Sequence, residues 1–257
     1  MKIEKVFKKR KRVIDIILLT YNKIECTKKC LEHIFKNTSP FFSLTIFDNY
    51  STDGTVEFLK SFAYDKDNIN LILSNKNCGI IEGRNRANKF LDILGQRSDY
   101  LFILDNDQFV QASWLNSYMS FMDKYDIVGM EGWEMRKDFY PIRRAKKKND
   151  IYHYVSCCGM MIKNEVVKKI GLFDEKFSPM FFEDPCFCFR AIDKGYKVCR
   201  NTDFNVIFHE PHSLLGDNGE KRRYFLQSWE YFKKKYKNRK LLNLLHHKGG
   251  GFSGTTD

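Results

Sequence analysis

The sequence lacks any segment that would mark a membrane-spanning or secreted protein. The apolar run at residues 13–19 is far shorter than the roughly 20 residues that a spanning helix needs. The basic segment KKRKR near the N-terminus precedes a predicted core strand, and not the apolar segment with a cleavage site that a signal peptide requires. We therefore expect a cytoplasmic protein, with peripheral contact to an anionic membrane as an open alternative.

The sequence also lacks a disulfide or zinc framework, although it has eight cysteines. No two of them have the C-x-x-C spacing of a zinc knuckle, and CxC on a helix points its thiols to different sides. Burial as small apolar side chains is the simpler expectation, and reduced thiols agree with a cytoplasmic protein. The cysteines are Cys26, Cys30, Cys78, Cys157, Cys158, Cys186, Cys188 and Cys199.

Glycine-rich phosphate loops are missing as well. Gly79 and Gly83 do not form the G-x-G-x-x-G pattern of dinucleotide-binding proteins. A nucleotidyltransferase, the nearest alternative among enzymes, would need a loop rich in glycine and lysine near the N-terminus. The segment LLTYNKIE at residues 18–25 does not supply one.

Positive charge and apolar side chains are abundant. The chain of 257 residues has 44 Lys and Arg against 32 Asp and Glu, which gives a net charge of +12 and favours anionic partners. A hydrophobic fraction of 43% with 23 Phe and 13 Tyr predicts a folded core. A nucleic-acid-binding module would explain the charge, but it needs exposed aromatic residues, and most aromatic residues here sit in apolar runs.

Apolar runs and helical patterns alternate in the first hundred residues. Strands are predicted at residues 13–19, 43–47, 70–73 and 101–104, and helices at residues 24–36, 55–62 and 80–94. This alternation predicts an α/β fold with a parallel sheet.

Each predicted strand ends in polar residues, which would meet at one edge of the sheet. Asp105 and Asp107 follow the strand at residues 101–104 and offer oxygen ligands to a divalent cation that also binds a diphosphate. Asp48 could accept hydrogen bonds from a base or ribose, and Tyr21 could stack on the base. Polar turns that merely cap loops explain one such strand end but not a series of them.

A second pair of acids, Glu183 and Asp184, follows Phe181 and Phe182 at the start of a predicted helix that runs to Asp193. Transfer to an acceptor hydroxyl needs a base, and this pair is the candidate. The alternative is that both are ordinary acids in the first turn of a helix.

Two basic segments have no assigned role. Residues 131–150 lack periodicity and contain a basic run at residues 143–148, which is either a solvated charge run or a mobile loop facing an anionic substrate. Residues 220–236 predict a basic amphipathic helix that packs on the core or lies on a membrane surface. A flexible tail is predicted for residues 246–257.

Taken together, these motifs resemble glycosyltransferase family 2, which has the GT-A fold. The resemblance extends over residues 13–213 and is carried by IILLTYNKIE, FDNYSTDGT, NKNCGIIEGRNRA, LDNDQ, the segment from CCGMMIK to DKGYKV, and FHEPHS. It implies a nucleotide-sugar donor, a divalent metal ion (Mn²⁺ or Mg²⁺) and an inverting displacement. UDP-sugars are the expected donor class and dTDP-sugars the next, with a glycan, a lipid-linked sugar or a protein as the acceptor.

The resemblance also assigns roles to single residues. It places Asp105 and Asp107 in the DxD-type metal motif, with Asp107 as the direct ligand, and His209 or His212 as a late metal ligand. Asp184 corresponds to the general base, and we expect its neighbour Glu183 to orient the acceptor or the start of the helix. The expected donor-contacting residues are Thr20, Tyr21, Glu25, Asp48, Asp53, Arg84, Asn85, Asp105 and Asn106.

The expected architecture is a GT-A domain with a Rossmann-like, mixed but mostly parallel sheet flanked by helices. Residues 1–215 would form this domain, with nucleotide-sugar binding at about residues 13–107 and the acceptor side at about residues 108–215. Residues 216–257 would form a basic helical extension and tail.

Overall fold

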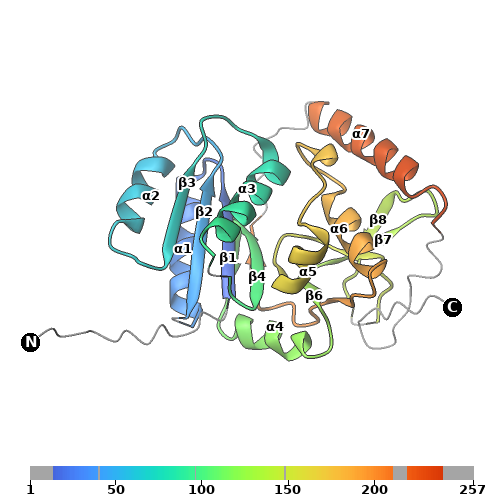
Figure 1. The fold of residues 1–257 in the computed structure, drawn as a ribbon, viewed down its shortest axis with the longest axis horizontal. Helices are drawn as coiled ribbons and strands as arrows, with labels where there is room; N and C mark the ends of the chain where they lie inside the picture. Colours follow the sequence, from blue (N-terminus) through green and yellow to red (C-terminus); the bar gives the residue numbers. More distant parts are fainter. Residues whose placement is uncertain (1–13, 40, 96, 148, 211–218, 240–257) are drawn as a thin grey trace, which may run out of the picture.

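A seven-stranded mixed sheet forms the centre of the computed structural model, which describes residues 14–39, 41–95, 97–147, 149–210 and 219–239 (Figure 1). Among the described strands of this central sheet only β10 runs antiparallel to its neighbours, so the predicted mostly parallel sheet is confirmed. In spatial order the strands are β11 (Val198–Arg200), β6 (Ile127–Gly129), β10 (Met160–Lys163), β4 (Tyr100–Asp105), β1 (Ile14–Thr20), β2 (Phe42–Asp48) and β3 (Ile69–Leu73).

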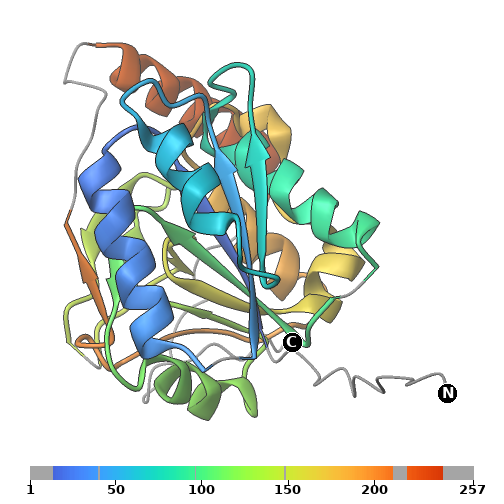
Figure 2. The ribbon, with the colours of Figure 1, turned by 90° about the vertical axis from the view of Figure 1, so that its left-hand side faces the viewer.

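Helices cover both faces of the sheet because successive strand residues point to opposite faces. Ile14, Ile16 and Leu18 of β1 join one core with α1 (Ile24–Asn37), α2 (Thr55–Ala63) and α4 (Trp114–Met122). Ile17 and Leu19 join the other core with α3 (Gly79–Ile93), α5 (Asn164–Ile170) and α6 (Glu183–Ile192). Figure 2 shows α1 and α3 on opposite sides of the strands. The apolar run at residues 16–19 of β1 follows from this burial on both faces.

Two small sheets stand beside the central one. The first pairs β5 (Gln108–Val110) with β12 (Ile207–His209), and the second has the order β8 (Pro141–Arg144), β7 (Gly132–Met135), β9 (Tyr154–Val155). Both β7 and β8 fall where the sequence shows no periodicity.

The first residues of the basic run are therefore part of a β-hairpin. Arg143 lies 2.7 Å from Glu134 and Arg144 lies 2.5 Å from Glu131, each measured from guanidinium nitrogen to carboxylate oxygen. These two arginines are exposed to solvent and are also paired with carboxylates.

All eight cysteines are free thiols, and most of them are buried, as expected for small core side chains. A short 3₁₀ helix, Glu175–Phe177, connects α5 to α6. In the described part of the chain, none of the helices has the length and apolar composition that crossing a bilayer demands.

The helix α7 (Glu220–Lys235) packs against α6 and the β7–β8 hairpin (Figure 1). Phe232 is fully buried, with ring centroids 5.4 Å from Phe139 and from Phe189 and 5.2 Å from Phe182. This aromatic cluster attaches α7 to the core. The predicted flexible tail lies outside the described residues.

Phe232→Ala should therefore destabilise the whole fold. Loss of a buried Phe costs about 3–5 kcal/mol in the free energy of unfolding, because it removes apolar burial and leaves a cavity. Urea denaturation followed by circular dichroism measures this change. Leu226→Ala on the same helix, where the side chain is 40% exposed, is the control and should stay within about 0.5 kcal/mol of wild type. Equal effects of the two substitutions would contradict the packing role of Phe232.

Candidate active site

The carboxyl ends of β1, β2 and β4 meet at one edge of the sheet, as the sequence predicts. Thr20 is paired in register with Asp48, and Leu19 with Asp105. The Thr20 hydroxyl donates a 3.0 Å hydrogen bond to the Asp48 carboxylate. The polar ends of these strands therefore form one continuous site.

Asp48 is fully buried at this edge and has its hydrogen bonds within the protein. Besides the bond from Thr20, its carboxylate accepts a 2.9 Å bond from the Ser51 amide and a 2.6 Å bond from the Ser51 hydroxyl. In this structure Asp48 shapes the loop after β2, and its contact with a nucleotide base stays a prediction.

Asp53 connects the two loops that follow β1 and β2. Its carboxylate accepts a 3.0 Å bond from the amide of Ile24, the first residue of α1, and a 2.6 Å bond from the hydroxyl of Thr55, the first residue of α2. Tyr21 is exposed in the loop after β1, and Glu25 is exposed in the first turn of α1, where it pairs with Lys28 at 2.7 Å. Asp53 thus caps two helices, while Tyr21 is free to meet a ligand.

Arg84 lies at the centre of the site and is fully buried. Its Nη2 lies 2.7 and 2.8 Å from the two carboxylate oxygens of Asp105, and its Nη1 donates to the sulfur of Cys157 at 2.9 Å. The preceding residue permits this depth, because a Cβ on Gly83 would lie 2.8 Å from Leu19 Cδ1. Close packing of α3 on the sheet therefore places Arg84 at the strand ends.

Asn85, the next residue, points away from this centre. Its amide donates 2.9 Å and 3.1 Å bonds to the Phe173 carbonyl and the Glu175 carboxylate, and its carbonyl accepts a 3.0 Å bond from the Phe173 amide. Of the two predicted donor-contacting residues on α3, only Arg84 reaches the strand ends. Adjacent helix residues point about 100° apart, and the sequence did not show which of them faces inward.

Asp105 and Asn106 of the predicted metal motif both make their hydrogen bonds to other protein groups. The Asp105 carboxylate is bound by Arg84 and also accepts a 2.9 Å bond from the Cys158 thiol. Asn106 donates to the Asn22 carbonyl at 3.0 Å and to the Thr27 hydroxyl at 2.9 Å, which ties the loop after β4 to α1.

Asp107 faces His209, with 3.6 Å between carboxylate oxygen and Nε2. Pairing of β12 with β5 places His209 opposite Gln108, one residue from Asp107. The neighbouring Asp107 carboxylate raises the pKa of His209, against the lowering effect of burial. The alternative late ligand, His212, lies outside the described residues.

The fit of a divalent cation can be judged from these side chains. Among the described residues, no three side chains of His, Cys, Asp or Glu converge closely enough to hold a metal ion alone. Asp107 and His209 do face each other, and their donor set suits Mn²⁺ or Mg²⁺ when phosphate oxygens or water complete the coordination shell. This pair fits the implied ion, whereas Asp105 is engaged by Arg84.

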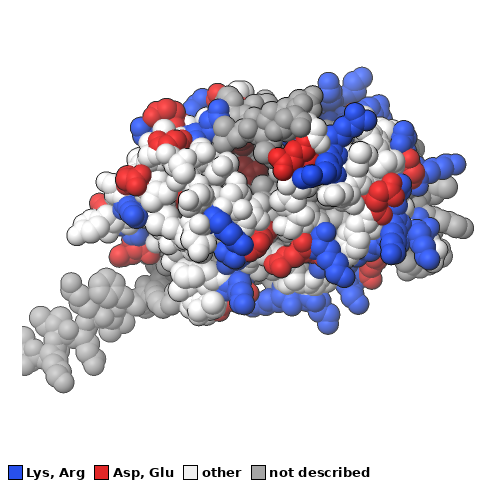
Figure 3. All heavy atoms as spheres, turned by 90° about the horizontal axis from the view of Figure 1, so that it is seen from above, with Lys and Arg blue, Asp and Glu red and all other residues white. Residues whose placement is uncertain are grey.

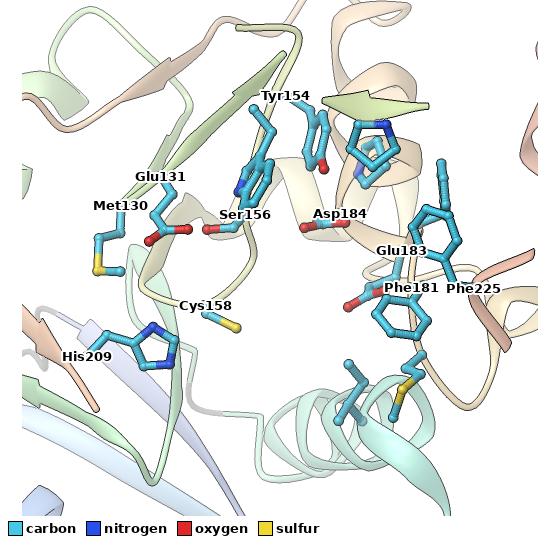
Figure 4. A pocket seen from close by; sticks show the side chains of 16 residues that line it. Met130, Glu131, Tyr154, Ser156, Cys158, Phe181, Glu183, Asp184, His209 and Phe225 are labelled. Carbon is cyan, nitrogen blue, oxygen red and sulfur yellow. The ribbon is translucent and has the colours of Figure 1, made fainter. Parts of the chain in front are cut away.

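Glu183 and Asp184 line a cavity of about 420 Å³ together with His209 and Cys158 (Figure 4). Glu183 is 4% exposed and its Oε1 lies 3.6 Å from Arg84 Nη1. Burial raises the pKa of Asp184 well above its usual range, and the charge of Glu183 raises it further. Figure 3, which views the molecule from the top of Figure 1, shows acidic side chains recessed in a hollow.

The residues before this acid pair have an unusual backbone. Phe181 and Phe182 both have positive φ, at 75° and 66°. Bulky residues rarely adopt this conformation, which costs about 1–3 kcal/mol for each residue. The turn starts α6 abruptly, so that its first two residues, the acids, face the cavity.

Several residues of the site were not assigned from the sequence. Glu131, Tyr154 and Ser156 line the cavity and come from the region around β7 and β9. Cys157 and Cys158 were expected to be buried apolar residues, but they also contact Arg84 and Asp105. Nothing in the sequence around Cys157 and Cys158 predicted that these thiols would contact Arg84 and Asp105.

Substitution of two aspartates should change stability in opposite directions. Because the pKa of Asp184 is raised, ionisation destabilises the folded state, and this cost grows as pH rises through the raised pKa. Asp184→Asn should therefore be more stable than wild type at pH 8, and the gain should shrink as pH falls. Urea denaturation at several pH values measures it.

Asp53→Asn is the matched control. Burial opposes ionisation of Asp53, but hydrogen bonds from Thr55 and Ile24 outweigh it and lower its pKa. Asp53→Asn should therefore lower the free energy of unfolding by about 0.5–2 kcal/mol at neutral pH, the size of a lost helix cap. This loss should shrink as pH falls below the ordinary aspartate pKa. Stabilisation by Asp53→Asn, or destabilisation by Asp184→Asn at pH 8, would refute these assignments.

The chain is similar in sequence and in fold to known glycosyltransferases. Glycosyltransferase AglE of Haloferax volcanii is 24% identical over 198 residues, which cover 72% of this chain and 63% of AglE. The structure of S. aureus TarS in complex with UDP-GlcNAc aligns with a TM-score of 0.58 at 18% identity, over 78% of this chain and 59% of that one.

A mannosyltransferase of Pyrobaculum calidifontis, PcManGT in complex with GDP-Man and Mn²⁺, also aligns with a TM-score of 0.58, at 16% identity, over 76% of this chain and 56% of that one. These glycosyltransferase structures share the fold, which confirms the predicted GT-A architecture. The chain spans less than two thirds of the length of AglE and of each of these two proteins.

The family model described as glycosyl transferase family 2 matches residues 15–192. This match includes the strand ends, the buried Arg84 and the acid pair. Because it extends over more than half of the sequence, the chain belongs to glycosyltransferase family 2.

Proposed function

We propose that this chain transfers a sugar from a nucleoside-diphosphate sugar to an acceptor hydroxyl, with inversion at the transferred carbon. The observation that carries this proposal is one cavity with Glu183 and Asp184 on one side and His209, the partner of Asp107, on the other (Figure 4). A donor between these sides would present its diphosphate to His209 and its sugar to the acids.

The strand ends would bind the nucleotide. Tyr21 offers an exposed ring to the base, and Thr20, Asp48 and Asp53 hold the loops around it. UDP-sugars are the proposed donor class, supported by the UDP-GlcNAc bound to TarS; the GDP-Man bound to PcManGT makes a purine donor the alternative to test.

Asp107 and His209 would hold Mn²⁺ or Mg²⁺, for which the Mn²⁺ bound to PcManGT is the support. A bound divalent cation neutralises charge that develops on the departing diphosphate. Asp105 would act beside it by keeping Arg84 in place, because its carboxylate is engaged by that guanidinium.

Asp184 would be the general base. Its raised pKa suits a group that accepts the proton of the acceptor hydroxyl as the new C–O bond forms. Glu183 would orient the site through Arg84, since its Oε1 lies 3.6 Å from Nη1.

In this proposal residues 13–107 bind the nucleotide sugar and residues 108–215 form most of the acceptor side. The helix α7, in the predicted extension at residues 216–257, contributes to that side as well, because its Phe225 lines the cavity. A glycan, a lipid-linked sugar and a protein are the acceptor classes that this reaction accommodates.

Asp184→Asn tests the base. It should reduce turnover by about 10²–10⁴-fold, the usual contribution of a general base, because an amide cannot accept the proton. The assay is single-turnover hydrolysis or transfer with UDP-glucose, UDP-galactose, UDP-GlcNAc, GDP-mannose and dTDP-rhamnose, with donor affinity measured by calorimetry. Glu183→Gln should reduce turnover less than Asp184→Asn does. If Glu183→Gln loses turnover while Asp184→Asn keeps it, Glu183 is the base; if both keep it, the mechanism is wrong.

Asp107→Asn tests the metal site. The variant should lose most of the increase in UDP affinity that Mn²⁺ gives, because a neutral amide oxygen is a weaker ligand than a carboxylate. Calorimetric titration of UDP with Mn²⁺ and with a chelator measures this difference. Asp65→Asn makes the same charge change at an exposed pair with Lys66 and should behave as wild type. An unchanged metal-dependent gain in Asp107→Asn would exclude this ligand.

A further inference from the structure

The walls of the active-site cavity are mostly apolar and carry aromatic side chains from four separate segments. Trp133 comes from β7, Tyr154 from β9, Phe181 from the turn before α6, and Phe225 from α7. Phe225 is fixed by its neighbours, with ring centroids 5.4 Å from Tyr140, 5.5 Å from Phe181 and 5.4 Å from Phe182. We call these four side chains, Trp133, Tyr154, Phe181 and Phe225, the aromatic wall.

Polar groups lie beside the aromatic wall. Glu131 and Ser156 line the same cavity as Asp184 (Figure 4), and the Ser156 amide donates a 2.8 Å bond to the Glu131 carbonyl. Glu131 is oriented by Arg144 at 2.5 Å. These groups stand next to the proposed base without being needed for its chemistry.

The hydroxyl of Ser156 is unusual because it is buried and has no hydrogen-bond partner among the described residues. A buried hydroxyl without a hydrogen-bond partner is unfavourable, because it has lost its bonds to water. The residue itself is half-buried at the cavity wall, so rotation about its Cα–Cβ bond can turn the hydroxyl toward the cavity without breaking a bond to another described residue. A ligand hydroxyl would supply the missing partner.

These surfaces discriminate between the acceptor classes. A lipid chain would fit the aromatic wall but would remove water from Glu131, Ser156 and Asp184 without replacing their hydrogen bonds. A short serine or asparagine side chain would reach the base but leave most of the aromatic wall uncovered. A sugar ring offers an apolar C–H face and hydroxyls at its edge, which suits a mostly apolar pocket with a few placed polar groups.

We propose that the acceptor group is itself a sugar, packed against the aromatic wall with a hydroxyl bonded to Ser156. This inference rests on the proposed glycosyltransferase function, and it names the acceptor class of that site. It assigns acceptor-binding roles to Ser156 and Phe225.

Ser156→Ala is the primary test. If the role of Ser156 is only structural, the variant should be as stable as wild type or more stable, because the hydroxyl has no described partner to lose. Its affinity for ligands should then be unchanged. The proposal predicts a folded variant whose affinity for sugars falls about tenfold, the effect of one lost hydrogen bond. The probes are methyl glycosides of glucose, galactose, N-acetylglucosamine, mannose and rhamnose, with affinities measured by ligand-detected NMR in the presence of UDP and Mg²⁺.

Ser43→Ala is the matched control. Ser43 also has a buried hydroxyl without a partner among the described residues, but it lies on β2 and does not line the cavity. It should bind the glycosides as wild type does. Equal affinities in Ser156→Ala and Ser43→Ala would overturn the role of Ser156.

A second pair of variants tests the aromatic wall. Phe225→Leu should weaken glycoside binding several-fold, whereas Trp229→Leu, one turn later on α7, should not. Both side chains pack on Tyr140, at 5.4 and 5.2 Å, but only Phe225 lines the cavity. Equal losses in both variants would mean that α7 acts by general packing, and the assignment of Phe225 would be wrong.

The inference and the proposed function can fail separately. If the wild-type protein hydrolyses a nucleotide sugar but binds none of the glycosides, or transfers to a polyprenyl phosphate or a serine peptide that carries no sugar, the acceptor inference is overturned. If glycosides bind and Ser156→Ala weakens them, but no nucleotide sugar binds or is hydrolysed, the sugar site stands and the proposed donor chemistry fails.

Discussion

A buried cation, Arg84, is the feature on which the rest of the site depends. A guanidinium without contact to water is expensive unless it is paired and hydrogen-bonded. Burial alone would lower the pKa of Arg84, but Asp105, the two thiols of Cys157 and Cys158, and Glu183 outweigh this effect and raise it. Removal of one of these carboxylates would leave buried charge without compensation, so Arg84, Asp105 and Glu183 form a unit.

This unit joins three segments that are distant in sequence. Arg84 belongs to α3, Asp105 ends β4, and Glu183 begins α6. The proposed donor and acceptor sides are therefore connected by direct polar contacts, and a shift at one carboxylate changes the environment of the other. The close approach of α3 at Gly83 is what makes this connection geometrically possible.

The parts of the fold that sequence reasoning could reach are those with a strong physical signal. β1 and β4 are buried on both faces, which accounts for the apolar runs at residues 16–19 and 101–104, and each run ends in polar residues at the shared sheet edge. The helix that begins at Glu183 was also predicted, from the two acids in its first turn. By contrast, β7, β8 and β9 are two to four residues long and alternate poorly, so no periodicity marks them.

The roles of single polar residues were harder to predict, because capping and ligand binding use the same residue types. Asp53 and Asn106 have the chemistry of ligands, yet in the fold they hold loops to helix starts. Asn85 differs from Arg84 only by one position on α3, and its outward direction follows from packing with Phe173. The pairing of His209 with Asp107 depends on a short strand contact that local sequence does not encode.

The helix α7 lies outside residues 15–192, the part of the chain that matches the family, yet it supplies Phe225 to the cavity. Phe182, the residue before Glu183, packs against both Phe225 and Phe232 of this helix, with ring centroids 5.4 and 5.2 Å apart. In the proposed function, α7 would therefore have two tasks, as a wall of the acceptor site and as support for the turn that carries Glu183. A change of acceptor that arose through this helix would then have to keep the aromatic contacts that support Glu183.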